Sequence, residues 1–590
     1  MKSILFAALA PLLGYASGLV LERSSNQWRA LNSSINGNLV SVRPVADACH
    51  RPDFNLNQCD AVLANNNNSL FRSEQPGAVQ WTNWEAWPKR NESCYPEVSQ
   101  YTPCGQGRIS LYSAVVESAE DIQEAVRFAS RYNVRLAIKN TGHCFLGRSA
   151  APESLQIATY KMNKIHFTED FYSSGAPAGA NTSLGSAVTI GAGVKLKPLY
   201  AAASEHNVSL AIGLAHTVGA AGGYIQGGGH SPLGPVLGMA SDNALEFTAV
   251  KANGDLVIAN EHQNTDLFWA LRGGGGGTFG VVVSVTLRTF PDMPTLFAVG
   301  QVQIPGPVSD GYWDTVTAFH SCFPALSDAG ASGYYSILPN SMVNGTAMPL
   351  ISFQLFFVNK TDAAPAKKIL DAFMVEASKY TQSANYTVDK APSVIQAINM
   401  GLAPTESDGG GGIVTIASRL FSRDLLSCQD GPSRLSNALK DIYNDDHSTS
   451  WTGHLVAGGA VASNRDIDSA LNPAWRRTIT HITFGRSWPN NATLSEQRAI
   501  QHKLTYVDNE KLRVLEPDMG AYLNEADAHD AGFQQSFWGE NYDRLYKIKQ
   551  NLDPQGLFIV RRGVGSEDWD EDGICKVKRS CGGHDTQARL

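Results

Sequence analysis

Three glycine-rich segments could together bind a nucleotide cofactor. They cover residues 139–149, 217–231 and 267–280. Glycines let the backbone approach a diphosphate closely, and glycine-rich turns expose several N–H groups to it. Taken alone, the glycine run 273–277 would equally fit a flexible linker, and His143 would fit an ordinary surface histidine. Because regular elements are expected on both sides of each segment, we predict a single nucleotide-binding module.

The chain lacks the short motifs of several other enzyme classes. A Gly-x-Ser-x-Gly elbow, a His-Glu-x-x-His or Cys-x-x-Cys zinc pair and a Gly-Lys-Ser/Thr phosphate loop do not occur. One Gly-x-Gly-x-x-Gly is present at 275–280, but a nicotinamide site needs a strand before it and a helix after it. Here a helix-like stretch, 267–271, precedes and a strand-like stretch, 281–286, follows. We therefore exclude a nicotinamide site and expect no metal site.

Composition narrows the class of protein further. A chain of 590 residues is too long for a single hydrophobic core, which stops growing at about 250–300 residues, so two large domains, or one domain with a large insertion, are expected. The net charge of −8 disfavours a nucleic-acid partner, which requires a basic surface. A hydrophobic content of 43% excludes general disorder, and 54 glycines without a fixed period exclude collagen.

The N-terminus predicts a secreted protein. Met1-Lys2 is a positive start, an apolar run follows at 4–13, and small residues end at Gly18, which is the plan of a cleavable signal peptide. A buried first helix or a membrane anchor is the alternative, but a membrane span needs about 20 apolar residues. No later stretch is long and apolar enough, so no membrane partner is expected. Nine Asn-x-Ser/Thr sequons agree with secretion: Asn32, Asn67, Asn91, Asn181, Asn207, Asn344, Asn359, Asn385 and Asn491.

The nine cysteines suit an oxidising compartment. Cys49 and Cys59 are ten residues apart, as are Cys94 and Cys104, and Cys575 lies near Cys581. Cys322 and Cys428 could pair in the middle of the chain, which would leave Cys144 unpaired. Spacing does not fix the connectivity.

Regular structure is expected from residue 107 onward, after loops and short helices in 19–106. Ser118–Tyr132 is predicted as a helix, because Ser118 and Asp121 form a capping box before apolar residues at helical spacing. The other elements expected up to residue 292 are strand Val134–Lys139, strand Thr189–Gly193, helix Leu196–His206, hairpin Leu245–Ala259 turning at Asn253-Gly254, helix Asp266–Arg272 and strand Val281–Phe290. This mixture indicates an α+β nucleotide-binding module.

A second region follows at about 293–519, where helices are expected beside an antiparallel sheet. Its predicted strands are Phe297–Ile304, Leu350–Val358, Gly412–Leu420, Leu455–Val461 and Thr478–Phe484. The run Gly409–Gly412 is interpreted as a flexible loop. Beyond Gly520 a helix, Tyr542–Gln550, is expected to stop at Asp553-Pro554.

The glycine-rich segments and the tail together resemble the berberine-bridge-enzyme-like branch of the vanillyl-alcohol oxidase superfamily over most of the mature chain. The stretches that carry the resemblance are the Thr-Gly-His loop of 139–149, Gly-Gly-Gly-His at 227–230, Ala-Ser-Asp-Asn at 240–243, Asp266–Gly275, Trp538–Tyr542 and Asp553–Phe558. The resemblance implies an α+β fold with a two-part, PCMH-type FAD-binding domain and a substrate domain whose antiparallel sheet is flanked by helices. The implied division is signal peptide 1–18, disulfide-stapled segment 19–106, FAD-binding domain 107–292, substrate-binding domain 293–519 and a C-terminal segment 520–590 that returns to the FAD domain.

The same resemblance implies covalently bound FAD. The histidine at the position of His143 is joined to the 8α carbon of the flavin in this family, and some members add a cysteine tether where this chain has Ala215. A single tether at His143 is therefore expected, with Cys144 as a free thiol. The cofactor-binding residues carried over are Lys139, Asn140, Thr141, Gly142, His143, Gly147, Arg148, Ser149, Thr217, Gly219, Gly222, Gly223, Gly227, Gly228, Gly229, His230, Asp242, Asn243, Gly274, Gly275, Gly280 and Asn541.

The resemblance implies an oxidoreductase in which a substrate hydride passes to the flavin, O2 reoxidises the flavin, and a base takes a proton. Tyr522 ranks first as that base because Tyr522-Leu523-Asn524 matches an active-site Tyr-x-Asn; Glu525 and His481 are further candidates, and Arg486 is a candidate oxyanion stabiliser. The expected substrate is a small secondary metabolite or aromatic compound, and the protein is expected to be monomeric. The alternatives are a secreted carbohydrate oxidase and a flavin-carrying binding or antigenic protein with vestigial activity.

Overall fold

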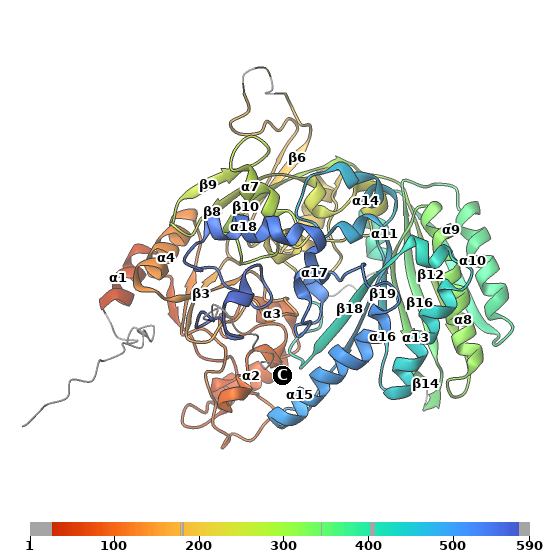
Figure 1. Cartoon of the computed structure of the whole chain (residues 1–590), viewed down its shortest axis with the longest axis horizontal. Helices are drawn as coiled ribbons and strands as arrows, with labels where there is room; N and C mark the ends of the chain where they lie inside the picture. The colour runs from red at the N-terminus through yellow and green to blue at the C-terminus, as the bar shows by residue number, and fades with distance from the viewer. Residues whose placement is uncertain (1–25, 178, 180–181, 344, 402–406, 578–590) are drawn as a thin grey trace, which may run out of the picture.

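The computed structural model describes residues 26–577 apart from 178, 180–181, 344 and 402–406. The predicted signal peptide and Cys581 lie outside these residues. The described chain has two sheet-containing halves, with the earlier part of the chain on the left of Figure 1 and the seven-stranded sheet on the right. None of the described helices has the length and apolar content needed to cross a bilayer.

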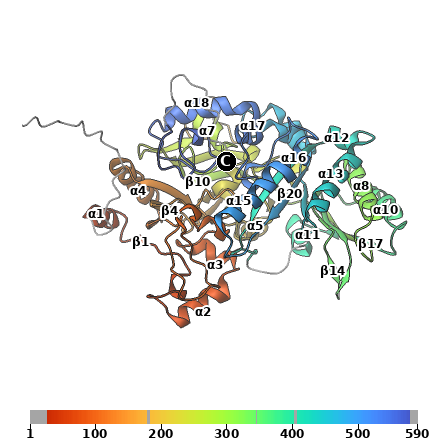
Figure 2. The same ribbon diagram turned by 60° about the horizontal axis from the view of Figure 1, so that its bottom comes forward.

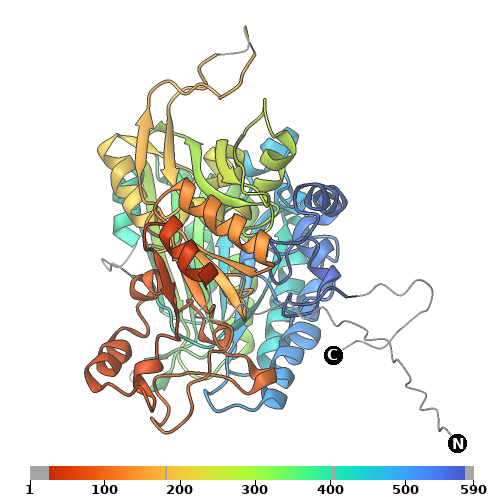
Figure 3. The same cartoon turned by 90° about the vertical axis from the view of Figure 1, so that its left-hand side faces the viewer.

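The first half contains two sheets. One has the order β1 (Leu39–Ser41), β2 (Tyr112–Val115), β4 (Ser154–Ala158), β3 (Arg135–Lys139); the other has the order β5 (Ile165–Thr168), β6 (Ala187–Gly191), β10 (Val281–Arg288), β8 (Ala244–Val250), β9 (Leu256–Ala259). Helix α4 (Ala119–Tyr132) begins with the predicted capping box and packs its apolar face on the first sheet. Helix α1 (Asn26–Ser34) lies against α4 (Figure 3). The Trp28 ring packs on Phe128 of α4 at 4.7 Å between ring centroids and stacks on Tyr112 of β2 at 4.3 Å.

The predicted elements of this half are confirmed with shifts of a few residues at their ends. The helices of this half near the glycine-rich segments are α5 (Leu196–Glu205), α6 (Gly234–Leu237) and α7 (Thr265–Leu271). The hairpin forms between β8 and β9, in register from Val250 with Leu256. Gly254 has φ +82°, which explains why the turn requires glycine there.

The second half is built on one seven-stranded sheet in which every neighbouring pair is antiparallel. Its order is β17 (Ser383–Ala391), β12 (Thr295–Gln303), β16 (Leu350–Val358), β13 (Ala331–Leu338), β19 (Trp451–Leu455), β20 (Thr478–Arg486), β18 (Thr415–Ser422). Figure 1 shows helices packed on one side of it: α8 (Asp310–Ser321), α9 (Phe323–Asp328), α10 (Ala364–Ala377) and α13 (Gly431–Asp445). The α+β prediction, with an antiparallel sheet flanked by helices, is confirmed.

Alternate residues of this sheet face opposite sides. Tyr335, Phe353 and Leu455 point into the apolar core under the helices. Their neighbours Tyr334, Gln354 and His454 point to the other side. The sheet thus presents a row of polar and aromatic side chains toward the first half of the molecule.

Several predictions for this half are wrong. Leu455–Val461 is not a strand: β19 ends at Leu455 and helix α14 (Gly459–Ser463) follows. The strands β13 and β17 were not predicted, because β13 contains Gly333 and β17 is a largely exposed edge strand rich in polar residues. The run Gly409–Gly412 is held in place rather than free, since Gly409 bridges to Asn68 and Gly412 to Trp81.

The remaining helices join or cover the two halves. Near the N-terminus are α2 (Leu56–Asn65) and α3 (Ser69–Glu74), and α2 projects at the bottom of Figure 2. Later in the chain are α11 (Val394–Gly401), α12 (Arg423–Ser427), α15 (Leu494–Lys503), α16 (Asn509–Arg513), α17 (Phe533–Trp538) and α18 (Tyr542–Leu552). The last two return to the first half, where the Trp538 indole donates to Gly273 O at 3.1 Å and Lys549 Nζ donates to Thr278 O at 2.8 Å.

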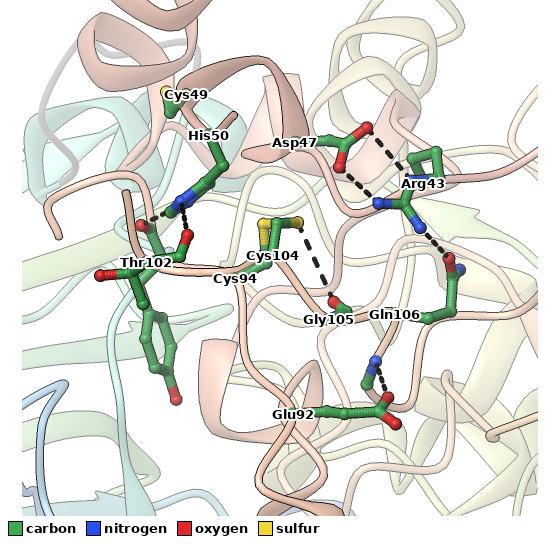
Figure 4. Close-up of a disulfide and its surroundings, with 12 residues drawn as sticks. Arg43, Asp47, Cys49, His50, Glu92, Cys94, Thr102, Cys104, Gly105 and Gln106 are labelled. Atoms are coloured by element: carbon green, nitrogen blue, oxygen red, sulfur yellow. Dashed lines mark hydrogen bonds and ion pairs between the residues drawn. A yellow bond between two sulfur atoms is a disulfide. The ribbon is translucent and has the colours of Figure 1, made fainter. Parts of the chain in front are cut away.

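Two of the cysteine pairs suggested by spacing form disulfides, Cys49–Cys59 and Cys94–Cys104. In Figure 4 the neighbouring His50 ring is directed at Thr102 O, 2.8 Å away, which ties the two stapled loops together. The suggested pair Cys322–Cys428 is wrong, since both are free. The Cys322 thiol turns back along its own helix and donates to Ala318 O, and burial raises its pKa to about 11. Cys144 is a free thiol, as predicted.

A buried histidine in the second half makes stability depend on pH. His320 on α8 is fully buried among Phe319, Phe323 and Tyr335, and burial lowers its pKa to about 3. In the unfolded chain this histidine takes up its proton at a pH of about 6.5. The contribution of the buried, neutral imidazole to the free energy of unfolding is therefore fully present above that pH and is lost as the pH falls toward 3. We expect His320→Gln to reduce the loss in melting temperature between pH 7 and pH 4.5 by several degrees relative to the unchanged protein, as measured by scanning calorimetry. Equal losses in both proteins would contradict this assignment.

Candidate functional site

One cavity of about 570 Å³ lies between the glycine-rich loops and the polar face of the seven-stranded sheet. The predicted residues that line it are Asn140, Thr141, Gly142, His143, Arg148, Ser149, Gly219, Gly222, Gly223, His230, Gly280, Tyr522 and Glu525. Segments far apart in the sequence therefore meet at one place. The backbone of the glycine-rich loops forms one part of the wall, and the side chains of His230, Tyr522 and Glu525 form another.

The loop after β3 is shaped by its glycines. Gly142 has φ +80° and Gly147 has φ +72°, and a Cβ on Gly147 would lie 2.5 Å from the Trp84 ring. Arg148 lines the cavity while its guanidinium donates to the carbonyls of Arg561 and Arg562, at 3.1 and 2.9 Å. The C-terminal segment thus holds the arginine of the first loop in place.

The five-glycine run is part of the wall and not a linker. Gly273 N and Gly275 N both donate to Gln226 O, at 3.1 and 2.8 Å. A Cβ on Gly276 would lie 2.9 Å from the Cα of Gly223, so two backbones approach each other here without side chains. The unpartnered oxygens Asn140 Oδ1 and Gln226 Oε1 lie in this region, which leaves hydrogen-bonding groups for a polar ligand.

His143 ends a short hydrogen-bond chain. Its Nε2 lies 2.7 Å from Thr217 Oγ1, and that hydroxyl donates its only hydrogen to Asp408 Oδ2 at 2.9 Å. The Thr217 oxygen must then accept from His143, so the ring proton is on Nε2 and the lone pair is on Nδ1. Among the described residues Nδ1 has no hydrogen-bond partner.

The surroundings of His143 and Asp408 keep the imidazole neutral and the carboxyl group ionised. Burial lowers the pKa of His143 to about 4, more strongly than Asp408 raises it, so the imidazole is neutral near pH 7. Burial opposes ionisation of Asp408, but the N–H groups of Thr217 and His216, at 2.9 and 3.0 Å, outweigh it and lower its pKa. The arrangement is a neutral histidine oriented by a carboxylate through one hydroxyl.

The opposite wall carries a histidine-rich cluster. Glu525 Oε1 lies 3.3 Å from His230 Nε2, and His454 Nδ1 lies 2.9 Å from His481 Nδ1. Tyr522 packs edge-on against His230 at 5.1 Å between ring centroids, and its hydroxyl accepts from Asn524 Nδ2 at 2.8 Å. His481 lies behind the wall and does not line the cavity.

The charges of this cluster are unequal. Burial opposes ionisation of Glu525, yet the attraction of His230 and His454 lowers its pKa below the ordinary value. Burial also raises the pKa of Tyr522 far above its ordinary value and lowers the pKa of His454 and His481. Near neutral pH the cluster therefore holds one carboxylate, a protonated phenol and two neutral imidazoles at His454 and His481.

The other predicted residues lie behind the lining and hold it. Lys139 Nζ donates to Arg72 O, Asp242 pairs with Arg476 at 2.8 Å, and Asn541 donates to Leu471 O. The complete set that does not line the cavity is Lys139, Gly147, Thr217, Gly227, Gly228, Gly229, Asp242, Asn243, Gly274, Gly275, Asn541 and His481. Arg486, the candidate oxyanion stabiliser, also lies outside, because it is buried against Asp508 and Asp446 at 2.7 and 3.1 Å.

Several lining residues were not predicted from the sequence. Outside the predicted glycine-rich segments they include Trp81, Tyr334, Gln354, Asp408, Gly409 and His454, and inside those segments Tyr224, Gln226, Gly276 and Gly277 were not named individually. Tyr334, Gln354 and His454 could have been found from the alternation of inward and outward residues, had their strands been aligned. No local sequence pattern predicts Asp408, because it is brought next to Thr217 only by the folding of distant segments.

Comparisons with known proteins agree with this geometry. The profile of the family described as "FAD binding domain" matches residues 111–260, and that described as "Berberine and berberine like" matches residues 521–565. An uncharacterized FAD-linked oxidoreductase of Arthroderma benhamiae is 49% identical, with 94% of each chain covered. The FAD-linked oxidoreductase malF of Malbranchea aurantiaca is 41% identical over 93% of this chain and 91% of its own.

A solved structure extends the likeness to three dimensions. The VAO-type flavoprotein MtVAO615 of Myceliophthora thermophila C1 is 29% identical, has a TM-score of 0.82 and covers 96% of this chain and 100% of its own. Berberine bridge enzyme from Eschscholzia californica, at 17% identity and a TM-score of 0.62, shares the fold over 91% of this chain and 99% of its own.

Proposed function

This chain belongs to the berberine-bridge-enzyme-like branch of the vanillyl-alcohol oxidase flavoproteins, and we propose that it oxidises a small secondary metabolite or aromatic compound with a flavin held covalently by His143. It is an FAD-linked oxidoreductase. When bound, FAD accepts a hydride from a substrate carbon, and in the proposed oxidase it passes the electrons to O2.

The observation that carries the proposal is one cavity with two chemically different walls. Glycine backbones and the unpartnered oxygens Asn140 Oδ1 and Gln226 Oε1 offer hydrogen-bonding groups to a nucleotide with close backbone approach. The cluster around Glu525 offers a proton acceptor. The residues present fit a flavin nucleotide along the first wall with a small substrate at the second.

The Asp408–Thr217–His143 chain supports the covalent bond. Attachment of a carbon to imidazole needs a nitrogen lone pair, and the hydrogen bond from Nε2 leaves that lone pair on Nδ1. Ala215 lines the cavity where some family members carry a cysteine, so no sulfur is present there for a second bond. We infer one tether only, with FAD bound at the cavity wall that holds His143.

At the other wall, Glu525 is the group that takes the substrate proton. Its carboxylate carries negative charge and lies within reach of His230, which can share the proton. Tyr522 stays protonated, so its phenol orients the substrate by hydrogen bonding and does not act as the base. This reverses the order of the sequence-based ranking, which placed Tyr522 first.

Secretion is also part of the proposal. Six of the nine sequon asparagines are exposed, as glycosylation in the secretory pathway requires: Asn67, Asn91, Asn207, Asn359, Asn385 and Asn491. Asn32 is half-buried, and Asn181 and Asn344 lie outside the described residues. The two disulfides suit the same compartment. We further propose that the protein is a monomer.

The test is anaerobic mixing of the flavin-loaded protein with panels of candidate substrates. We expect loss of flavin absorbance at about 450 nm with aromatic alcohols or secondary metabolites, and its return with formation of hydrogen peroxide when O2 is admitted. Bleaching only by oligosaccharides would replace the proposed substrate class by carbohydrates. No bleaching by any compound would favour a binding protein with vestigial activity.

A further inference from the structure

Three imidazoles and one carboxylate meet in a single place beside the cavity, and we propose that they form a Zn2+ site. They are His230, His454, His481 and Glu525, and one ligand atom from each lies within 4.8 Å of all the others. No sequence motif predicts these four residues as a metal site, because they come from four separate elements: β19, β20, the loop before α6 and the short turn at Leu523–Glu525.

The distances are close to those of a tetrahedral metal site. Ligand atoms at the usual Zn–N and Zn–O bond lengths are about 3.3 Å from one another. Glu525 Oε2 lies 3.5 Å from His454 Nδ1 and 3.7 Å from His481 Nδ1, and Glu525 Oε1 lies 3.3 Å from His230 Nε2. All four ligand atoms lie within 4.8 Å of one another, and metal binding would draw them closer together.

Hydrogen bonds alone leave this cluster poorly satisfied. His454 and His481 can share one proton between their Nδ1 atoms, but neither is within hydrogen-bonding distance of Glu525 Oε2. The outer nitrogens His230 Nδ1 and His481 Nε2 have no partner among the described residues, so nothing behind the rings fixes their tautomers. A cation would use the inner lone pairs of all three rings and neutralise the buried carboxylate.

The donor set selects the kind of metal. Three imidazole nitrogens and one carboxylate oxygen suit Zn2+, whereas Mg2+ and Ca2+ prefer oxygen ligands. Four protein ligands complete a tetrahedron, and such closed sites differ from catalytic zinc sites, which keep a position open for water or substrate. With all four positions filled by protein ligands, the metal is expected to bind without coordinating the substrate or taking part in its oxidation.

This gives the site a regulatory consequence, which rests on the proposed function. Glu525 cannot ligate Zn2+ and accept the substrate proton at the same time. Zn2+ should therefore inhibit flavin reduction, and a chelator should restore it. Zinc binding itself does not depend on the identity of the substrate.

Calorimetric titration of Zn2+ into the flavin-loaded, chelator-stripped protein tests the site. We expect about one equivalent per chain. Glu525→Gln, which keeps the shape of the side chain, and His454→Gln should each weaken binding by at least about 10–100-fold. His166→Gln is the matched control, since His166 is an exposed histidine on β5, and it should bind like the unchanged protein.

The outcomes separate the two proposals. Absence of stoichiometric binding, or equal binding by Glu525→Gln with its flavin and melting temperature intact, would overturn the zinc site and leave the oxidase proposal standing. Zn2+ binding with an unchanged rate of flavin reduction, measured with a compound that bleaches the metal-free protein, would overturn the inhibitory role. A metal-free protein that no compound bleaches would instead count against the proposed function.

Discussion

His143→Ala should abolish covalent attachment of the flavin. No other nitrogen lone pair in the described cavity wall is oriented by a chain like that of Thr217 and Asp408. Acid precipitation should leave a yellow pellet with the unchanged protein and a colourless pellet with the variant, whose flavin should appear in the supernatant. Mass spectrometry of a proteolytic peptide should locate the added flavin mass on His143 in the unchanged protein.

The supporting residues provide graded controls. Asp408→Asn and Thr217→Val break the chain that holds the proton on Nε2, so both should lower the covalent fraction without abolishing flavin binding. Cys144→Ser should keep the full covalent fraction, because a single tether at His143 is expected. If His143→Ala retained acid-stable flavin while Cys144→Ser lost it, the tether would belong to the thiol and our assignment would be wrong.

The sequence predicted the cofactor half well because its signals are local. The Ser118–Asp121 capping box and the turn at Asn253-Gly254 each specify one conformation over a few residues. The glycine loops could be identified for the same reason, since positive φ at Gly142 and Gly147 restricts the residue type. The family resemblance then supplied the histidine, which composition and periodicity could not.

The second half of the chain was harder to predict because the contacts that determine its structure join residues far apart in the sequence. Leu455–Val461 has the composition of a strand, but the chain turns after Leu455 and forms α14. A disulfide between Cys322 and Cys428 was suggested from their positions in the sequence, yet both thiols are free in the folded chain. Likewise, the cluster at Glu525 joins residues almost 300 positions apart, as in its bond to His230, so only strand order and register reveal it.

Glu525→Gln should reduce the rate constant for anaerobic flavin reduction by about 10²–10⁴, the usual contribution of a positioned general base. The amide keeps the size of the side chain and its place beside His230 but cannot take up a proton. Stopped-flow absorbance of chelator-stripped protein measures this step without the O2 reaction. Tyr522→Phe should reduce this rate constant by a smaller factor, because the phenol is protonated and serves only to orient the substrate.

The pH profile distinguishes a base from a structural carboxylate. The pKa of Glu525 is lowered, so the base is ionised at neutral pH and the rate of reduction should fall only as the pH drops through that lowered value. In Glu525→Gln the rate of flavin reduction should be low and should no longer show this fall at acidic pH. A variant that reduces its flavin within a few-fold of the unchanged protein, with the acidic limb still present, would remove Glu525 from the proton transfer and direct attention to His230, the only other titratable group hydrogen-bonded to it among the described residues.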